Sequence, residues 1–285
     1  MDMIDLHVHS NCSDGTFTPT ELVTYALKKG LSAFALTDHD TTDGIDEAMQ
    51  AAEGQPVSVI PGIEFSTNYE GKDLHIVGLF IDKEHPVFRA RLAEFLASRK
   101  KRNIEMCRRL REIGGIDIDY DTLRALYPDS VLTRAHYADY LMKHHYVGNK
   151  KEAFDRYVGD HCSCYVPREK VSPEDVVALL KETGAISALA HPTLYHMSDA
   201  RLETLISHLK EVGLDGMETI YSTYTEGETR QMKSLAKKYD LLESGGSDFH
   251  GANKPTIDLA IGKGHLAVPD SVLEKMEAAR AIKLT

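Results

Sequence analysis

Short apolar runs alternate with amphipathic segments along this chain, and this alternation limits the fold more than any other feature of the sequence. In the first eighty residues the expected elements are strand 3–8, helix 18–30, strand 32–40, helix 43–52, strand 57–66 and strand 74–81. Thr18 opens the first helix signal, Pro19 suits the first helical position, and Glu21 completes a capping box. The order predicts a parallel α/β structure, because parallel strands need a crossover segment that is usually a helix.

The same rhythm returns in the last third of the chain. There the expected elements are helix 172–184, strand 185–192, helix 199–211, strand 214–220, helix 226–239 and strand 241–251. Between the two parts no strand-like run occurs, and the pattern predicts helices at 85–111, 119–126, 133–145 and 150–158. We therefore predict an α/β frame built from residues 1–82 and 166–285, with a helical insertion at 83–165 as a candidate substrate cap.

The predicted insertion differs from the rest of the chain in charge. Residues 83–170 contain 18 Lys and Arg against 13 Asp and Glu, whereas the whole chain has a formal net charge of −11. Much of the excess lies in residues 99–111 of the long helix. Two interpretations stay open, a solvated helix face and an electrostatic guide for a polyanionic substrate.

Composition excludes several classes of protein. No apolar run approaches the roughly 18 residues of a membrane span, and the first residues lack the basic and apolar parts of a signal peptide. Four cysteines without such a signal indicate a reducing compartment, so we expect a cytoplasmic protein without a membrane partner. The negative charge and the absence of tryptophan argue against a stable complex with DNA. No sequence feature indicates an oligomeric state.

Histidines and carboxylates gather at the ends of the expected strands. They are His7, His9, Asp14, His39, Glu64, His191, Asp248 and His250, and also His75, which differs because it precedes its apolar run. In a parallel barrel the carboxyl ends of the strands converge on one face, where active sites lie. The pattern therefore predicts one shared site.

These residue types are metal ligands. Imidazole and carboxylate together suit Zn, Mn or Fe. His7 and His9 lie two residues apart on an extended segment, so both side chains point to the same face. The set exceeds the three or four protein ligands of one ion, so we expect two to three divalent ions, and Glu64 could bridge two of them.

Five motifs carry a resemblance that covers nearly the whole chain. They are H-x-H-S-x-x-S-D-G-x-x-x-P at His7–Pro19, T-D-H-D-T at Thr37–Thr41, P-G-x-E at Pro61–Glu64, A-H-P at Ala190–Pro192 and G-S-D-F-H at Gly246–His250. Together they resemble the PHP (polymerase and histidinol phosphatase) superfamily. Asp14 before a glycine, the insertion, and Arg134 in Thr133–His136 are similar to its branch of small bacterial phosphoesterases that act on nucleotides.

The resemblance implies a distorted (β/α)7 barrel of the TIM-like type with a trinuclear metal centre, for which we favour Mn over Fe or Zn. The three implied ligand sets are His7, His9, Glu64 and Asp248; Glu64, His75 and His191; and Asp14, His39 and His250. The implied reaction is hydrolysis of a nucleotide phosphomonoester by a metal-bridging hydroxide. The expected substrate is the 3′-phosphate of a nucleoside 3′,5′-bisphosphate, with 5′-to-3′ trimming of short RNA left open.

Four further residues are expected to contact the substrate. Arg134 would grip a phosphate bidentately, with a helix-face ion pair as the alternative, and His136 stands in the same short motif. Tyr165 and Glu218 are candidates for contacts to the nucleoside. His191 or a metal ion could assist departure of the leaving 3′-oxygen, which makes His191 the candidate catalytic residue beside Arg134.

The sequence leaves three other functions open. A histidinol-phosphatase-like activity is less favoured, because that branch typically has His where this chain has Asp14. An amidohydrolase-type enzyme that cuts C–N bonds would use similar ligands but would not need the basic insertion. A non-catalytic module often loses ligands, and this chain retains all nine.

Overall fold

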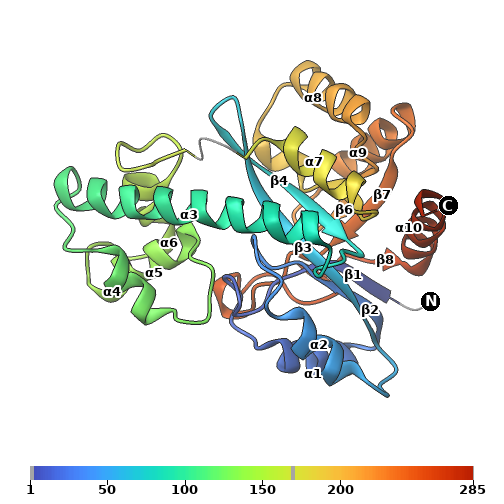
Figure 1. Ribbon diagram of the computed structural model, residues 1–285, viewed down its shortest axis with the longest axis horizontal. Coiled ribbons are helices and arrows are strands. Elements are labelled where there is room, and N and C mark those ends of the chain that lie inside the picture. The colour runs from blue at the N-terminus through green and yellow to red at the C-terminus, as the bar shows by residue number, and fades with distance from the viewer. Residues whose placement is uncertain (1–2, 168–170, 285) are drawn as a thin grey trace.

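The computed structural model describes residues 3–167 and 171–284, and within them eight strands form one sheet. The spatial order is β7-β6-β5-β4-β3-β2-β1-β8, and a bridge from Val8 to Phe249 joins the end of β1 to the segment after β7. The sheet therefore curves into a nearly closed barrel (Figure 1). The strands are β1 Met3–Val8, β2 Leu31–Leu36, β3 Ser58–Tyr69, β4 Lys72–Leu79, β5 Ile186–Leu189, β6 Gly216–Tyr221, β7 Leu242–Gly246 and β8 Val268–Pro269.

The α-helices follow the expected order closely. They are α1 Pro19–Lys29, α2 Ile45–Ala52, α3 Pro86–Glu112, α4 Tyr120–Leu126, α5 Arg134–Lys143, α6 Lys150–Ala153, α7 Pro173–Glu182, α8 Asp199–Val212, α9 Glu226–Lys238 and α10 Asp270–Lys283. Helix α6 continues into a π-helix at Phe154–Val158. Strand β8 and helix α10 were not among the expected elements. Thr18 and Glu21 form the predicted capping box of α1.

The expected parallel arrangement is wrong at one place. Strands β3 and β4 form an antiparallel hairpin, and β4 also runs antiparallel to β5. The hairpin turn is Glu70-Gly71, whose φ angles of 50° and 82° match the twist that a two-residue hairpin loop requires. Because β4 runs in reverse, its first half lies at the barrel end where the parallel strands finish. This explains why His75 precedes its apolar run.

Helices α4 to α6 and the π-helix lie to one side of the barrel, and α3 runs from them across the barrel (Figure 1). These helices, α3 included, are here called the helical segment. They share a buried core of their own, which includes Met106, Leu110, Tyr137, Leu141 and Val158. A separate cluster fills the space between the strands and helices α7 to α9, and it also includes Phe88, Leu92 and Phe95 of α3. The domain boundaries at 82/83 and 165/166 stay a prediction.

Polar contacts connect the helical segment to the barrel. Arg99 of α3 is 5% exposed, pairs with Asp40 after β2, and donates from Nη2 to Ser66 Oγ at 3.0 Å. Thr133 Oγ1, at the start of α5, donates to Asp14 Oδ2 at 3.0 Å. The helical segment is therefore held against the barrel end that carries the expected ligands.

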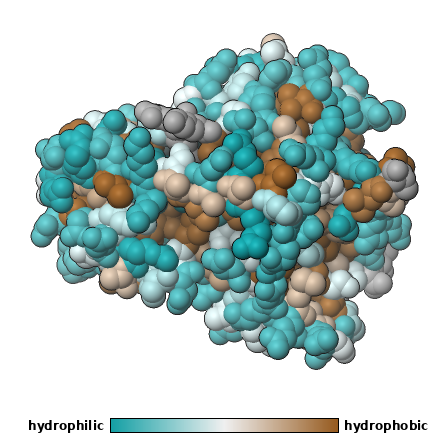
Figure 2. Space-filling model, viewed as in Figure 1, coloured by the Kyte–Doolittle hydropathy of each residue, from teal (hydrophilic) through white to brown (hydrophobic). Residues whose placement is uncertain are grey.

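The surface over α3 is mostly hydrophilic, and hydrophobic residues gather in a hollow below α3 between the helical segment and the barrel (Figure 2). In residues 3–167 and 171–284, no helix is both long enough and apolar enough to cross a membrane.

Candidate metal centre

All nine expected ligands lie at one end of the barrel. They come from β1 and its following loop (His7, His9, Asp14), from the loop after β2 (His39), from β3 and β4 (Glu64, His75), and from the segments after β5 and β7 (His191, Asp248, His250). Strand direction explains the convergence. The parallel strands have their carboxyl ends at this face, and the reversed β4 has its amino-terminal half there.

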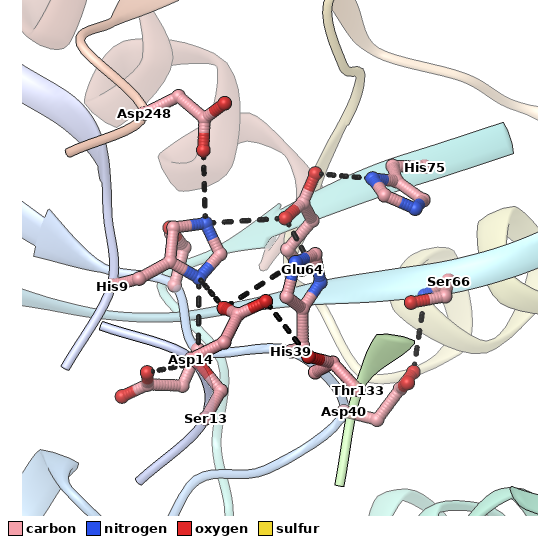
Figure 3. Close-up of polar contacts among 12 residues, drawn as sticks. His9, Ser13, Asp14, His39, Asp40, Glu64, Ser66, His75, Thr133 and Asp248 are labelled. Carbon is pink, nitrogen blue, oxygen red and sulfur yellow. Dashed lines mark hydrogen bonds and ion pairs between the residues drawn. The ribbon is translucent and has the colours of Figure 1, made fainter. Parts of the chain in front are cut away.

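Glu64 lies at the centre of the cluster (Figure 3). Its Oε2 is 3.2 Å from His7 Nε2, 3.2 Å from His9 Nε2 and 3.1 Å from His39 Nδ1. Its Oε1 is 2.8 Å from His75 Nδ1 and 3.0 Å from His191 Nε2. Five imidazoles thus surround one carboxylate, which is the geometry expected of a carboxylate shared between metal ions.

Two more carboxylates flank this centre on opposite sides. Asp14 Oδ1 is 3.1 Å from His250 Nε2 and 3.8 Å from His39 Nε2. Asp248 Oδ1 is 3.3 Å from His9 Nε2 and 3.3 Å from His250 Nδ1. The arrangement differs from the implied sets in one respect, because His9, His39 and His250 each face donors of more than one set.

The donor atoms fit divalent cations. Among the described residues, Asp14 Oδ1, Glu64 Oε2 and His39 Nδ1 are buried and have no hydrogen-bond partner. A buried polar atom without a partner is costly, and a bound cation would satisfy all three. The nitrogen and oxygen donors match the preferences of Zn, Mn and Fe.

Electrostatics at the cluster also favour positive charge. Burial alone would lower the pKa of His9, but the neighbouring carboxylates of Asp248 and Glu64 outweigh it and raise that pKa to about 9. Burial lowers the pKa of His39 to about 3, so its ring is neutral and ready to bind a metal. Since metal ions bind neutral histidine, loading the site would expel protons from His9.

Glu218 lies in a different place from the one expected. It is 1% exposed, its Oε1 is 2.8 Å from His7 Nδ1, and its Oε2 accepts from the His191 backbone N–H at 2.6 Å. This position behind His7 argues against a contact with the nucleoside. A carboxylate in this position instead fixes the orientation of a metal-binding imidazole.

Backbone conformation also marks the site. His191 and Asp248 have φ angles of 30° and 56°, in the left-handed region that favours glycine, and Asp40 follows His39 with 52°. Such strain costs of order 1–3 kcal/mol per residue and persists where the surroundings impose it. At Gly15, an added Cβ would lie 2.4 Å from the His9 carbonyl oxygen, so the glycine allows the loop that carries Asp14 to fold closely over β1.

A polar pocket opens above the cluster, between the barrel and the helical segment. Its lining includes the expected ligands Asp14, His39, His75 and His250 and the cations Arg99, Arg102, Arg134, Lys150 and Lys254. Arg134 lies there as expected, but it is already paired: Nη2 is 2.9 Å from Asp73 Oδ2, and Nη1 contacts Asp160. Arg134 therefore lies in the pocket and is ion-paired there, and its grip on a phosphate stays a prediction.

The two remaining candidates, Tyr165 and His136, have different surroundings. The Tyr165 hydroxyl donates to Asp73 Oδ1 at 2.7 Å, and its ring centre is 5.4 Å from the Arg134 guanidinium. His136 accepts at Nδ1 from the Thr133 backbone N–H at 2.9 Å. It lines a second depression beside Asp14 rather than the pocket that contains the other ligands.

Sequence reasoning missed several pocket residues. Arg99 and Arg102 are three residues apart on α3, a spacing that places both on one helix face, and both are buried against the pocket. Their exposed neighbours Lys100 and Lys101 are solvated. The basic cluster thus contains both a solvated face and a pocket-lining face. Lys254 carries no motif signal.

A barrel that gathers imidazoles and carboxylates beneath a cationic pocket is typical of a metal-dependent hydrolase. A family model described as PHP domain matches residues 5–143. A 5′-3′ exoribonuclease of Haemophilus influenzae is 41% identical over 273 residues, which are 96% of this chain and 97% of the relative. The chain belongs to the PHP family.

Two further comparisons agree. A 3′,5′-nucleoside bisphosphate phosphatase of Chromobacterium violaceum is 33% identical over 260 residues, which are 91% of each chain. A crystal structure from Bifidobacterium adolescentis, described as a metal-dependent phosphoesterase, has a TM-score of 0.84 and 29% identity and covers 98% of this chain and 96% of that one. The expected barrel fold is confirmed, and the protein is a hydrolase of phosphoric esters.

Proposed function

We propose that this enzyme removes the 3′-phosphate from nucleoside 3′,5′-bisphosphates in the cytoplasm and releases a 5′-nucleotide. The observation that carries the proposal is the pocket itself: buried metal-type donors form its floor and cationic side chains from the helical segment form its wall. The bisphosphate phosphatase among the relatives supports this choice of substrate.

The nine donors would hold two or three divalent ions, with Mn favoured. We assign His7, His9, Glu64 and Asp248 to the first ion, Glu64, His75 and His191 to the second, and Asp14, His39 and His250 to the third. When bound, such ions lower the pKa of water toward 7 and neutralise charge on phosphate oxygens. Glu218 would hold the His7 ring in the orientation that this ligation needs.

The helical segment would act as the substrate cap. Arg134 would bind a phosphate by exchanging its contact with Asp160, whose side chain is 45% exposed, while Asp73 keeps the guanidinium in place. Arginine suits this role because its planar donors match two phosphate oxygens. Tyr165 would support Arg134 from behind, and His136 would shape the loop at Thr133.

Two roles are considered for His191, that of a metal ligand and that of a proton donor to the leaving oxygen. Its Nε2 faces Glu64 at 3.0 Å, and its Nδ1 is buried without a hydrogen-bond partner among the described residues. His191 is also not among the residues that line the open pocket. This geometry favours His191 as a ligand and disfavours it as the proton donor to the leaving oxygen.

A second candidate activity is 5′-to-3′ trimming of short RNA, which the exoribonuclease among the relatives favours. The two reactions share one bond cleavage in our proposal. In both, water attacks the phosphorus attached to the 3′-oxygen of a 5′-phosphorylated nucleotide, the P–O3′ bond breaks, and a 5′-nucleotide leaves. Only the group on the far side of that phosphorus differs.

The test is phosphate release from adenosine 3′,5′-bisphosphate with added Mn²⁺, measured beside histidinol phosphate, a 5′-phosphorylated short RNA and a set of C–N substrates. We expect fast release from the bisphosphate with AMP as the second product. Arg134→Ala should raise KM more than it lowers kcat, whereas Arg111→Ala, on the exposed face of α3, should change neither.

Each alternative has its own signature in this assay. Faster turnover of the RNA than of the bisphosphate would make trimming the main activity. Release from histidinol phosphate alone would overturn the nucleotide assignment. Activity on C–N substrates without phosphate release would overturn the proposal as a whole.

A further inference from the structure

We propose that Lys254 is a catalytic residue whose ammonium group holds an oxygen of the phosphoryl group under attack. The inference deepens the proposed function and rests on it, because it assigns a phosphate contact within the same pocket. No motif of the sequence points to Lys254, and its role follows from its position in space.

Lys254 reaches the metal cluster from its rim. Its Nζ is 2.5 Å from Asp248 Oδ2, while the other oxygen of that carboxylate faces His9 and His250 at 3.3 Å. The ammonium therefore contacts one expected ligand, Asp248, directly and lies one carboxylate away from two others, His9 and His250. The Asp248 side chain is 5% exposed but that of Lys254 is 37% exposed, so the lysine is the partner that faces the pocket.

The loop that carries Lys254 is fixed by its neighbours. The Ala252 backbone N–H donates to Thr16 Oγ1 at 2.9 Å, and Asn253 Nδ2 donates to the Asp14 carbonyl oxygen at 2.7 Å. At Gly251 the φ angle is 60°, and a Cβ there would lie 2.2 Å from Thr16 Oγ1. The loop is therefore packed against β1 and its following loop, and Lys254 starts from a defined position.

The other cations of the pocket have partners farther from the cluster. Arg99 pairs with Asp40, Arg134 with Asp73 and Asp160, and Lys150 Nζ donates to Asn253 Oδ1 at 2.5 Å. Lys254, by contrast, contacts Asp248, an expected metal ligand, directly. Its position places a positive charge where the reacting phosphate must bind, not where a second phosphate or a nucleoside would bind.

The chemistry of lysine suits this place. An ammonium group has three donors, so it can keep its contact with Asp248 and still donate to a phosphate oxygen. A fixed positive charge beside the transferred phosphoryl group stabilises the negative charge that its oxygens carry in the transition state. Because Lys254 is in place before the substrate arrives, little reorganisation is needed.

The experiment compares Lys254→Met, Lys254→Arg and the control Lys263→Met in the full chain loaded with Mn²⁺. Lys263 is exposed in the same connection between β7 and β8, and its substitution removes an equal charge. Three quantities are measured: bound Mn by elemental analysis, affinity for inorganic phosphate by calorimetry, and kcat and KM for the bisphosphate.

We expect Lys254→Met to retain its Mn, to bind inorganic phosphate at least about tenfold more weakly, and to lose about a hundredfold in kcat/KM. Lys254→Arg should recover part of both losses, and Lys263→Met should match the wild type.

Two results would overturn the inference. Loss of Mn from Lys254→Met would mean that the lysine only positions Asp248, and unchanged phosphate affinity and rate would mean that it does not touch the phosphate. A wild-type enzyme that is inactive on nucleotides would instead refute the proposed substrate. The calorimetric comparison would still test Lys254, since phosphate is the product of any phosphomonoester.

Discussion

The barrel end and the helical segment handle charge in opposite ways. At the barrel end His7 and His9 are 0% exposed and Glu64 is 1% exposed, and their charges face one another. On α3 of the helical segment, Arg108 pairs with Glu105 and Glu112, and its side chain is 47% exposed. Exposed pairs of this kind are screened by water and contribute little, whereas buried groups interact strongly.

This contrast suggests a division of roles between metal binding at the barrel end and substrate binding by the helical segment. The buried donors of the barrel end are costly until a cation binds them, so this region is built for ligation. The helical segment has its own apolar core and can vary its exposed charges at little cost. Arg99 and Arg102 are the exceptions on α3, because they are buried where the two regions meet.

The largest effect is expected when a candidate metal ligand is removed from the barrel end. We expect His39→Ala or Asp248→Ala to lower turnover about a thousandfold or more, because the metal ions are held by these side chains. Each variant should still unfold cooperatively, and the rise in Tm that Mn²⁺ gives the wild type should shrink. His208→Ala, an exposed histidine on α8, is the control. Full activity in both variants would refute the ligand assignment.

The junction between the regions should be the next most sensitive place. Arg99→Met removes the partner of the fully buried Asp40, and breaking a buried ion pair costs about 3–5 kcal/mol. Urea unfolding measures this loss. Adding Asp40→Asn should recover part of it, whereas Arg111→Met on the exposed face of α3 should change little. A loss below about 1 kcal/mol would mean that the tie resembles a surface pair.

A substitution of Glu218, which contacts the candidate ligand His7, should lower activity by weakening metal binding. Glu218→Gln keeps the size of the side chain but removes the charge that faces His7 Nδ1 at 2.8 Å. Substitutions of such supporting carboxylates typically lower metal affinity or activity 10–100-fold. Titration with Mn²⁺ should show the weaker affinity, and excess Mn²⁺ should restore most of the rate. A change confined to the KM for nucleotide would instead revive the expected nucleoside contact.

The pH dependence of stability offers a milder test within the helical segment. Burial opposes ionisation of Asp139, but hydrogen bonds from Lys143 and Tyr127 outweigh it and lower its pKa. A lowered pKa in the folded state adds stability above the unfolded value near 4, and this is lost as the pH falls through the folded value. Asp139→Asn should therefore flatten the acid side of the stability curve. An unchanged slope would exclude this contribution.

The smallest effect is expected on the exposed face of α3. Arg108→Ala removes contacts to Glu105 and Glu112 that lie in water. We expect a change in unfolding free energy of less than about 1 kcal/mol, smaller still in high salt, and no change in turnover. A larger loss would show that the contrast between solvated and buried charge is weaker than the exposures imply.

The sequence allowed much of the barrel and the candidate site to be predicted. Thr18, Pro19 and Glu21 identified α1 because helix capping is local chemistry, and residues 85–111 identified α3 by their periodicity. The sequence selected nine candidate ligands, and the structure brings all nine to one end of the barrel. The hairpin of β3 and β4 was missed, although Glu70-Gly71 between two extended runs was a usable signal.

Other features had no local signal. The contacts of Glu218 with His7 and of Tyr165 with Asp73 could not be predicted, because the partners lie far apart in the sequence. Lys254 belongs to no motif, and a lysine in a loop is usually solvated, so no feature of the sequence selected it. Arg99 and Lys100 are neighbours in sequence, yet one is buried and the other is exposed.

The sequence by itself determined the order of elements, the family and the chemical type of the site, because helix caps, hydrophobic periods and ligand types are carried by short segments. Only the tertiary structure decided the direction of β4, the convergence of five imidazoles on Glu64 and the partners of Arg134, Glu218 and Lys254. Those depend on contacts between residues far apart in the chain, and such contacts exist only once the barrel has closed and the helical segment has packed against it.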